Sequence, residues 1–354
     1  MNCCEAPPGE FGEVAEGPGI DLLISRRGAL RGLAGALGGA AALAGGLARA
    51  DDKRLKLAFC GQLLCVVPYE VTRARGHFKA EGLDVELVYT RGGSQAMQAL
   101  VGGAVDYAGT SFDVALLAYA KGAKIRRFAS TGRLPLFALA TAPKTAKEIK
   151  SLKDLEGRTV AVSALGNADH SLLLYLLAKA GADPTKVRFA ALGTNLYDAL
   201  RLGQVDAGMV QEPALTLVAA AGGATLVNMM ELKDADRYVG GAYEFMGVSV
   251  RADEREARLD EMRRLARALA KGLADTRHIP VEEVVVALPK ELVAGGDRPQ
   301  LLKILERYRT SLYPETVKID TAAVDRVVES QKDAGVLKAP VDLAGLLDTS
   351  VVGG

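Results

Sequence analysis

Glycines and small polar residues gather directly after the short apolar runs of this sequence. The apolar runs predict strands, and a ligand of an open α/β sheet binds beyond the carboxyl ends of its strands, where helix N-termini present unpaired backbone N–H groups. Such groups, with neutral polar side chains, bind a small polar solute. The candidate ligand-binding residues at these positions are Gly61, Gln62, Ser94, Gln95, Thr110, Ser111, Asn167, His170, Thr194, Asn195, Gln211 and Glu212.

Some of these residues have a structural alternative. Ser94, Thr110 and Asn195 stand where helix N-caps are expected, and capping alone would account for their side chains. His170 is a stronger candidate for ligand contact, because it begins a predicted helix at a strand end. Glu212 is another, since it lies in a loop that the repeat described below places at a strand end.

The sequence offers no set of residues for catalysis or metal binding. It contains three histidines, of which His77 falls at a solvated helix end and His278 in a loop. A nucleophile, a base and an orienting acid cannot be assembled from these positions, and a closed zinc site needs four Cys or His ligands. We therefore predict that the protein is not an enzyme and holds no cofactor or metal.

The first fifty residues are predicted to be a cleaved export signal. The run from Ser25 to Arg31 contains Arg26 and Arg27, a Gly/Ala/Leu-rich stretch follows to Leu47, and Ala48-Arg49-Ala50 ends the segment. A charged start, an apolar middle and a small-x-small end are the parts of such a signal, and paired arginines are typical of the twin-arginine type. The apolar stretch is shorter than the roughly 20 residues that a membrane span needs. We expect cleavage after about Ala50, export by the twin-arginine machinery, and a periplasmic protein.

Export would leave two cysteines, Cys60 and Cys65, in the mature chain, because Cys3 and Cys4 belong to the signal. In an oxidising compartment such a pair can persist as a disulfide. Two free thiols are the other possibility, and the sequence leaves both open.

The mature chain alternates predicted strands and helices. Apolar and alternating runs predict strands at 55–59, 83–89, 105–109, 159–162, 187–191 and 205–210, and the segments that follow them predict helices at 66–79, 92–101, 112–120, 168–180, 196–202 and 214–220. Repeated strand-then-helix order is typical of a mainly parallel sheet flanked by helices, so the predicted fold class is α/β.

Two stretches of the chain are similar at an offset of one hundred residues. Residues 99–109 align with 199–209, and in both copies a polar tripeptide and an apolar helix follow. The repeat predicts two lobes of similar build. Asp106 and Asp206 hold the same position in the two copies, ahead of a strand, and we expect a structural role for both.

The end of the chain is predicted to return to the first lobe. A strand is expected at 245–250 and helices at 253–275, 281–287, 300–311 and 321–333. The predicted domains are the signal at 1–50, a first lobe of 51–133 plus 245–354, and a second lobe of 134–244. The two crossover segments between the lobes would form a hinge, which commonly closes around a ligand.

The composition excludes other classes of protein. Basic and acidic residues number 44 and 43, the formal net charge is +1, and no block of like charges occurs. Nucleic-acid binding is therefore not expected. The absence of Trp argues against a sugar receptor, because sugar faces usually pack on aromatic rings.

Several motifs resemble those of one family. They are the segments 76–87, 104–109 and 152–162, the segment 203–207 with Glu212-Pro213, and 334–337 ahead of 341–343. In this order, over nearly all of residues 53–350, they resemble periplasmic solute-binding proteins of ABC transporters from the nitrate, sulfonate, taurine and thiamine-precursor (NMT1-like) family. The resemblance implies a two-lobed periplasmic binding protein fold (type II-like), a monomer, and partners in an ABC permease and ATPase.

Two alternative functions remain beside the transport receptor. One is a receptor that presents its ligand to a membrane sensor. The other is a pyrimidine-synthesis enzyme on the same scaffold, which is the least favoured because its cysteine-rich motif is absent.

The charges near the predicted cleft leave the ligand open. Helix N-termini favour an anion such as a sulfonate or nitrate. Asp113, Asp169 and Glu212 would repel a bare anion and favour a ligand with donors, such as a zwitterion or an aminopyrimidine.

Overall fold

Two sheets of five strands each have the same strand order in this computed structural model, which describes residues 54–293 and 297–353. The predicted export signal lies outside the described residues. Sheet A has the order β2 (Val85–Thr90), β1 (Leu55–Cys60), β3 (Tyr107–Ser111), β10 (Met246–Arg251), β4 (Ile125–Ser130). Sheet B has the order β7 (Arg188–Ala191), β6 (Thr159–Val162), β8 (Ala207–Val210), β5 (Ala138–Thr141), β9 (Thr225–Asn228).

In each sheet the first three strands are parallel and the fourth runs antiparallel to both of its neighbours. Matched position by position, β1 corresponds to β6, β3 to β8 and β10 to β5. The predicted α/β class with two similar lobes is therefore confirmed, with one antiparallel strand in each mainly parallel sheet.

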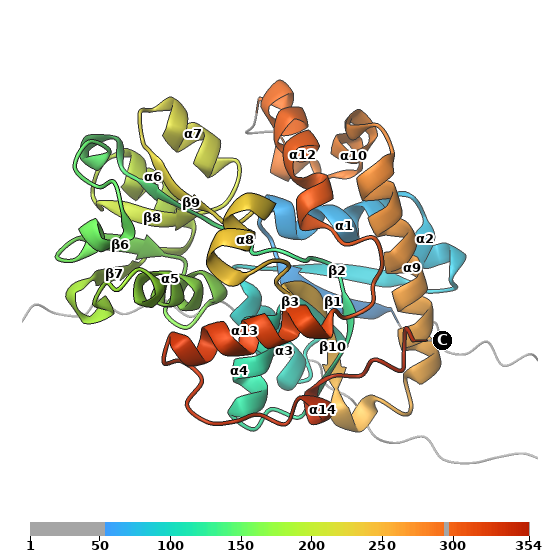
Figure 1. Cartoon of the computed structure of the whole chain (residues 1–354). Coiled ribbons are helices and arrows are strands. Elements are labelled where there is room, and N and C mark those ends of the chain that lie inside the picture. The colour runs from blue at the N-terminus through green and yellow to red at the C-terminus, as the bar shows by residue number, and fades with distance from the viewer. Residues whose placement is uncertain (1–53, 294–296, 354) are drawn as a thin grey trace, which may run out of the picture. The chain divides into compact units, whose positions relative to one another are not determined.

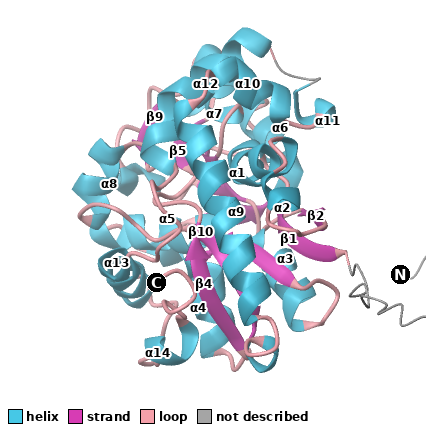
Figure 2. Cartoon of the chain, turned by 90° about the vertical axis from the view of Figure 1, so that its right-hand side faces the viewer, coloured by secondary structure: helices cyan, strands magenta, loops and turns pink. Residues whose placement is uncertain are grey.

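Helices flank both sheets (Figures 1 and 2). Those that follow the strands of sheet A are α1 (Leu63–Ala74), α2 (His77–Ala80), α3 (Gly93–Val101) and α4 (Phe112–Ala120). Those of the sheet B segment are α5 (Ala168–Lys179), α6 (Leu196–Arg201), α7 (Ala214–Ala220) and α8 (Leu232–Val239). The C-terminal helices are α9 (Leu259–His278), α10 (Val281–Ala287), α11 (Lys290–Val293), α12 (Arg298–Leu312), α13 (Thr321–Asp333) and α14 (Leu343–Leu346).

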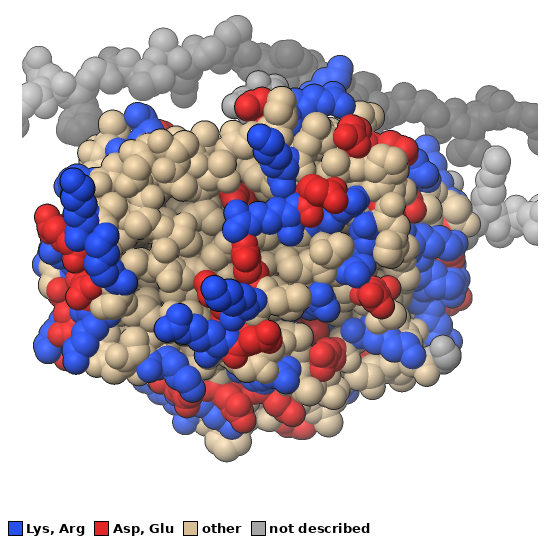
Figure 3. Space-filling model, turned by 45° about the horizontal axis from the view of Figure 1, so that its top comes forward, with Lys and Arg blue, Asp and Glu red and all other residues tan. Residues whose placement is uncertain are grey.

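None of the described helices has both the length and the apolar character that a membrane crossing requires. Charged side chains of both signs are interspersed over the face drawn in Figure 3, as the nearly balanced composition implies.

The predicted helix at 66–79 is wrong in its extent. Helix α1 begins earlier, at Leu63, and ends at Ala74, because Gly76 adopts a left-handed conformation with φ 76° before α2 begins. Pro68 lies inside α1 and has no N–H for the Leu64 carbonyl, which instead accepts a hydrogen bond of 2.8 Å from the Tyr313 hydroxyl. A side chain distant in sequence thus satisfies the backbone group that Pro68 leaves open.

The aspartates of the repeat have the same role in both sheets. Asp106 Oδ2 accepts a hydrogen bond of 2.9 Å from the backbone N–H of Lys56, and Asp206 Oδ2 accepts one of 2.8 Å from that of Thr159. Each bond fixes the turn before β3 or β8 against the neighbouring central strand. The structural role predicted for both aspartates is confirmed.

The chain passes between the two sheets twice, and the two crossover segments are hydrogen bonded to each other. The first leaves β4 and enters β5, and the second leads from α8 back to β10. Gly132 accepts from the N–H of Phe245 at 2.9 Å and donates to the Met246 carbonyl at 2.9 Å, while Tyr243 donates to the Arg133 carbonyl at 2.9 Å. The two crossovers therefore form one short antiparallel ribbon.

A buried arginine supports this ribbon from sheet A. Arg127 of β4 is fully buried and donates from its guanidinium to the carbonyls of Thr110 and Phe245, both at 2.8 Å. Its Nη2 lies 3.7 Å from the buried carboxyl of Glu244. Gly247 leaves the space for this group, because an added Cβ there would lie 2.4 Å from Nη2.

Two buried carboxyls belong to the same region. Burial raises the pKa of Glu244 to about 7, against the lowering effect of Arg127. Burial also raises the pKa of Asp113 to about 6, although its Oδ1 accepts hydrogen bonds of 2.7 Å from Tyr243 and from Gln331. Folding therefore favours the protonated form of both carboxyls at mildly acidic pH.

The raised pKa of Glu244 predicts a pH-dependent stability. A carboxyl with an unfolded pKa near 4.3 and a folded pKa near 7 holds its proton only in the folded state between these values, so its contribution to the free energy of unfolding falls as pH rises through this window. Glu244→Gln removes this loss. We expect urea unfolding to show the variant gaining stability relative to wild type from about pH 4.5 to about pH 7.

The matched control for this measurement is Glu282→Gln, at an exposed position on α10. Its free energy of unfolding should stay parallel to that of wild type over the same pH range. If the free energy of unfolding of Glu244→Gln runs parallel to that of wild type over this pH range, the assignment of a protonated carboxyl is contradicted.

Candidate functional site

Two adjoining cavities lie where elements of the two sheets meet. The smaller, about 40 Å³, is lined by Cys60, Gln62, Cys65, Arg91, Gly92, Gly93, Ser111, Val114, Phe137, Ser163, Asn167, Ala168, Asp169, Gln211, Phe245 and Met246. The larger, about 290 Å³, is lined by Gly61, Gln62, Leu63, Phe137, Ser163, Asp169, Gly193, Leu196, Tyr197, Met209, Val210, Gln211, Glu212, Pro213, Ala214 and Leu292. They share five residues, so we treat them as two chambers of one cleft.

Six of the twelve predicted ligand-binding residues line the cleft: Gly61, Gln62, Ser111, Asn167, Gln211 and Glu212. The structure does not bring Ser94, Gln95, Thr110, His170 and Asn195 to the lining of either chamber. The side chain of Thr194 lies outside the described part of the chain.

The residues that do not line the cleft have other contacts. Ser94 donates a hydrogen bond to Asn167 Oδ1, and Gln95 accepts one of 3.0 Å from the backbone of Arg91. Thr110 is buried in β3. His170 accepts from the N–H of Gly166 at 3.2 Å through Nδ1, and burial lowers its pKa.

The capping alternative is wrong for Ser94 and Thr110, and for Asn195 the position is confirmed but the side-chain bond is not formed. The N-cap of α3 is Gly92 and not Ser94, and the N-cap of α4 is Ser111 and not Thr110. Asn195 is the N-cap of α6 but makes no side-chain capping bond. The positions differ by one or two residues because β3 extends through Ser111 and α3 begins within its glycine pair.

The N-termini of four helices converge on the small chamber. Its lining includes the N-cap residues of α1, α3, α4 and α5, which are Gln62, Gly92, Ser111 and Asn167. The first turns of these helices carry unpaired N–H groups and the positive ends of the helix dipoles. With Arg91 beside them, they favour an anionic or hydrogen-bond-accepting group of a ligand.

Unpaired acceptors line both chambers. The buried Oε1 atoms of Gln62 and Gln211 have no hydrogen-bond partner among the described residues. Gln62 precedes α1 and Gln211 follows β8, so they face the cleft from the two predicted lobes. A buried amide oxygen without a partner is unfavourable, and a ligand with N–H or O–H groups would remove that cost.

Two carboxyls of the lining are held by their own loops. Asp169 accepts from the N–H of Ser163 at 2.5 Å and from its hydroxyl at 2.7 Å, and Glu212 accepts from the N–H and hydroxyl of Thr216, both at 3.0 Å. Burial raises the pKa of both carboxyls. When ionised, Asp169 adds negative potential to both chambers and Glu212 to the larger one, which favours ligand donors there.

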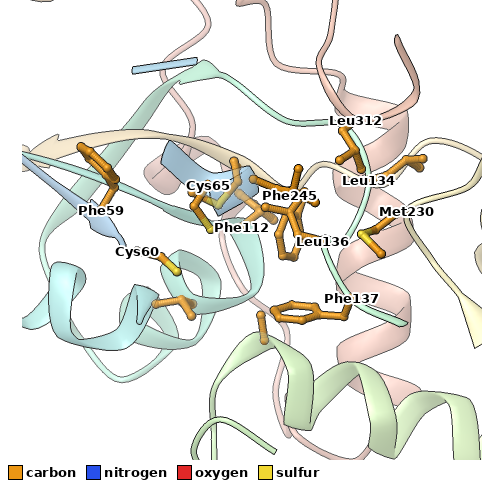
Figure 4. Close-up of a cluster of buried hydrophobic side chains, with 14 of the residues drawn as sticks. Phe59, Cys60, Cys65, Phe112, Leu134, Leu136, Phe137, Met230, Phe245 and Leu312 are labelled. Carbon is orange, nitrogen blue, oxygen red and sulfur yellow. The ribbon is translucent and has the colours of Figure 1, made fainter. Parts of the chain in front are cut away.

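The sequence analysis did not find Ser163 and Phe137, which line both chambers. Ser163 is the first residue after β6, so strict use of the strand-end rule would have included it. Phe137 lies in the first crossover segment, directly before β5, and its ring meets that of Phe245 edge to face with centroids 5.8 Å apart. Figure 4 shows these rings in an apolar cluster with Leu134 and Leu136.

Cys60 and Cys65 are free thiols in the structure, both buried and both in the lining of the small chamber. The disulfide that the sequence analysis left open is thus not formed here, and it stays a prediction for the exported protein. No three His, Cys, Asp or Glu side chains gather as a metal site would need within residues 54–293 and 297–353.

Comparisons with known proteins show the family of this chain and its fold. A family model described as NMT1/THI5 like matches residues 66–283. No curated protein sequence matches the chain.

Solved structures match over most of their length. A protein of Bordetella bronchiseptica RB50 is 25% identical, with a TM-score of 0.76 and coverage of 85% of this chain and 96% of that one. The alkanesulfonate-binding protein SsuA of Xanthomonas axonopodis pv. citri, bound to MOPS, is 19% identical, with a TM-score of 0.66 and coverage of 83% and 98%. The periplasmic nitrate-binding protein NrtA of Synechocystis PCC 6803 is 14% identical, with a TM-score of 0.64 and coverage of 85% and 87%. The fold is that of periplasmic binding proteins.

The hydrogen bond from Ser94 to Asn167 joins α3 of sheet A to the start of α5. A hydrogen bond contributes about 1 kcal/mol to stability. We therefore expect Ser94→Ala to raise the population of the state in which this contact is open about fivefold. Amide hydrogen exchange in the peptide that spans residues 164–170 measures it. Gln98→Ala, at an exposed position of the same helix, should leave this exchange unchanged. Equal exchange in both variants would contradict a role for the contact in closure.

Proposed function

The chain belongs to the NMT1/THI5-like family, and from this membership we propose that it is an extracytoplasmic solute-binding receptor of an ABC importer. It captures a small polar organic or anionic solute between two lobes by hinge closure and delivers it, chemically unchanged, to the permease. The similarity to structures described as sulfonate-binding and nitrate-binding proteins supports this class.

The proposed lobes are residues 51–133 plus 245–354 and residues 134–244. Their hinge is the ribbon of the two crossover segments, in which Gly132 pairs with Phe245 and Met246. Hinge motion is commonly absorbed by a few residues between packed bodies. The apolar cluster around Phe137 and Phe245 would stay packed at the hinge while the chambers open.

The proposal for the ligand rests on the groups that line the two chambers. Four helix N-termini face the small chamber. Unpaired amide oxygens and two carboxyls face the shared wall and the larger chamber. The small chamber has room for about three water molecules, which is also the size of a sulfonate or carboxylate group. A solute with an acidic group at one end and N–H donors at the other satisfies both sides. A taurine-like aminosulfonate fits this description best.

A thiamine-precursor-like aminopyrimidine is the second candidate. The rings of Phe137 and Tyr197 line the larger chamber, and a flat ring could pack against them while its amino group donates to Gln62 or Gln211. This ligand would donate hydrogen bonds to the acceptors of the cleft, and water would hydrate the helix N-termini.

The partners follow from the same class. We propose export through the twin-arginine machinery with removal of residues 1–50, a monomer in the periplasm, and docking to ABC permease and ATPase subunits. A receptor that presents its ligand to a membrane sensor would use the same cleft.

A thermal-shift screen of the purified protein tests the ligand class, because a ligand that binds only the folded state raises the apparent midpoint of unfolding. Taurine should raise the midpoint more than ethanesulfonate, which lacks the amine, and more than nitrate. An aminopyrimidine that alone raises it would favour the second candidate. A response to nitrate alone would overturn the proposed ligand class, and conversion of a ligand to a product would overturn the receptor function.

Substitutions in the cleft test the site. With the ligand found in the screen, we expect Gln62→Ala, Gln211→Ala and Asn167→Ala each to raise the dissociation constant about tenfold, the effect of losing 1 to 2 kcal/mol of hydrogen bonding. His170→Ala should have a smaller effect, because His170 does not line either chamber. Isothermal titration calorimetry measures both, and Gln204→Ala at an exposed position is the control. Unchanged affinity in all three variants would reject the assigned cleft.

A further inference from the structure

Two thiols lie on one wall of the small chamber, and reversible solute binding has no use for them. Cys60 is the last residue of β1 and Cys65 lies in the first turn of α1. Both are buried, both are free, and both line the same chamber. Figure 4 shows them within a cluster of buried side chains. The two thiols lie on consecutive elements, and each alters the pKa of the other.

The two thiols are electrostatically different. The interaction with Cys65 lowers the pKa of the Cys60 thiol, while the same interaction together with burial raises the pKa of Cys65 well above its usual value. The thiolate is the nucleophile in disulfide exchange, and the thiol that ionises more readily attacks first. Cys60 therefore has the character of an attacking thiol and Cys65 that of a resolving thiol.

The pair is placed to act on the cleft. The four residues between the cysteines include Gly61 and Gln62, and Gln62 lines both chambers. On the opposite side, Gln211 lines the same chamber as Cys65, and its side chain lowers the pKa of that thiol against the raising effects of Cys60 and burial. The pair thus holds one end of the loop that carries Gln62 and shares the chamber with Gln211 of the second proposed lobe.

We propose that Cys60 and Cys65 form a dithiol modification site that exchanges reversibly with small organic disulfides. The Cys60 thiolate attacks one sulfur of the disulfide, which releases one thiolate and leaves a mixed disulfide on Cys60. Cys65 loses its proton to solvent and attacks the Cys60 sulfur, which releases the second thiolate and closes the Cys60–Cys65 bond. The small molecule is reduced to two thiols and the protein dithiol is oxidised, so electrons and atoms balance.

The consequence for the cleft rests on the proposed solute-binding function. Oxidation joins the two sulfur atoms and thereby fixes the loop that carries Gln62. We expect the oxidised protein to bind its solute more weakly than the reduced protein. A chamber of about 40 Å³ does not admit an organic disulfide, so exchange also requires the cleft to open.

The first experiment needs no solute. The purified full chain is incubated in buffers of reduced and oxidised glutathione, free thiols are alkylated, and peptides are identified by mass spectrometry. Wild type should form a Cys60–Cys65 crosslink that dithiothreitol reverses under native conditions. Cys65→Ser should accumulate glutathione on Cys60 faster than Cys60→Ser accumulates it on Cys65, because the backbone of Gln62 still lowers the pKa of Cys60 while burial still raises that of Cys65.

Each other outcome overturns the proposal. If the thiols react only in urea, Cys60 and Cys65 are buried structural residues. A crosslink that dithiothreitol cannot reduce in the folded protein would make it a permanent structural disulfide. Equal reaction of Cys60 and Cys65 would remove the assigned order of attack. Cys60→Ala and Cys65→Ala, checked by circular dichroism and thermal unfolding, replace any serine variant that fails to fold.

A second experiment tests the link to the cleft. Gln211→Ala removes the side chain that lowers the pKa of Cys65, so the resolving thiolate forms less readily and the rate of crosslink formation in glutathione buffer should fall about fivefold, the effect of one lost hydrogen bond. Gln204→Ala, exposed and in the same segment, should react as wild type does. Equal rates in both variants would overturn the coupling of the thiols to the cleft.

These readouts separate the two proposals. Exchange without any solute response in the thermal-shift screen would leave the dithiol site standing and count against the receptor function. A solute that binds equally well to oxidised and reduced protein would support the receptor function and overturn control by the dithiol.

Discussion

A single buried guanidinium holds together the part of the molecule on which the cleft depends. Arg127 lies in β4, yet it donates to the carbonyls of Thr110 in β3 and Phe245 just before β10. A charge removed from water needs hydrogen-bond partners, and the two carbonyls accept from Nη1 and Nη2, while the Glu244 carboxyl lies 3.7 Å from Nη2 and Nε has no partner among the described residues. The site fits only because residue 247 has no side chain. The same group thereby links the ends of β3 and β10 to the ribbon of the two crossover segments, beside the cavity.

The shared plan of the two sheets explains why polar groups converge at one place. In each sheet a central strand is followed by a helix whose N-terminus points beyond the strand ends, and Asp106 or Asp206 fixes the turn before the third strand. When two such sheets are linked by a short ribbon, their strand ends lie opposite each other. The helix N-termini of both sheets then line one cavity, which neither sheet could form alone.

Local sequence signals predicted the local structure well. The helix at Phe112–Ala120 and the strand at Thr159–Val162 have the predicted bounds, since each is an apolar run with clear ends. The strand-end rule also placed Gln62 and Gln211 in the cleft, because it depends only on topology.

What the sequence could not show depends on partners far along the chain. Arg127 stands beside Arg126 in β4, where nothing in the sequence marks it as the buried one, and only the folded structure brings the carbonyl of Phe245 to it. Pro68 is compatible with α1 because Tyr313 satisfies the open carbonyl of Leu64. Phe137 lies in a crossover segment, where no periodicity marks a cavity wall. Contacts of this kind follow from the assembled fold and carry no local pattern.

The geometry of the cleft also explains how one scaffold can bind solutes of different charge. The helix N-termini belong to the backbone and are present whatever the side chains are, so an acidic end of the solute is recognised by the fold itself. Discrimination among acidic solutes then falls to the few polar side chains of the lining. Here these are Gln62 and Gln211, whose Oε1 atoms lack partners, with Glu212 tied to Thr216 behind them. A solute without donors would bury these oxygens unpaired at a cost of roughly 1 to 3 kcal/mol each, so selectivity for donor-bearing solutes arises from rejection of the others.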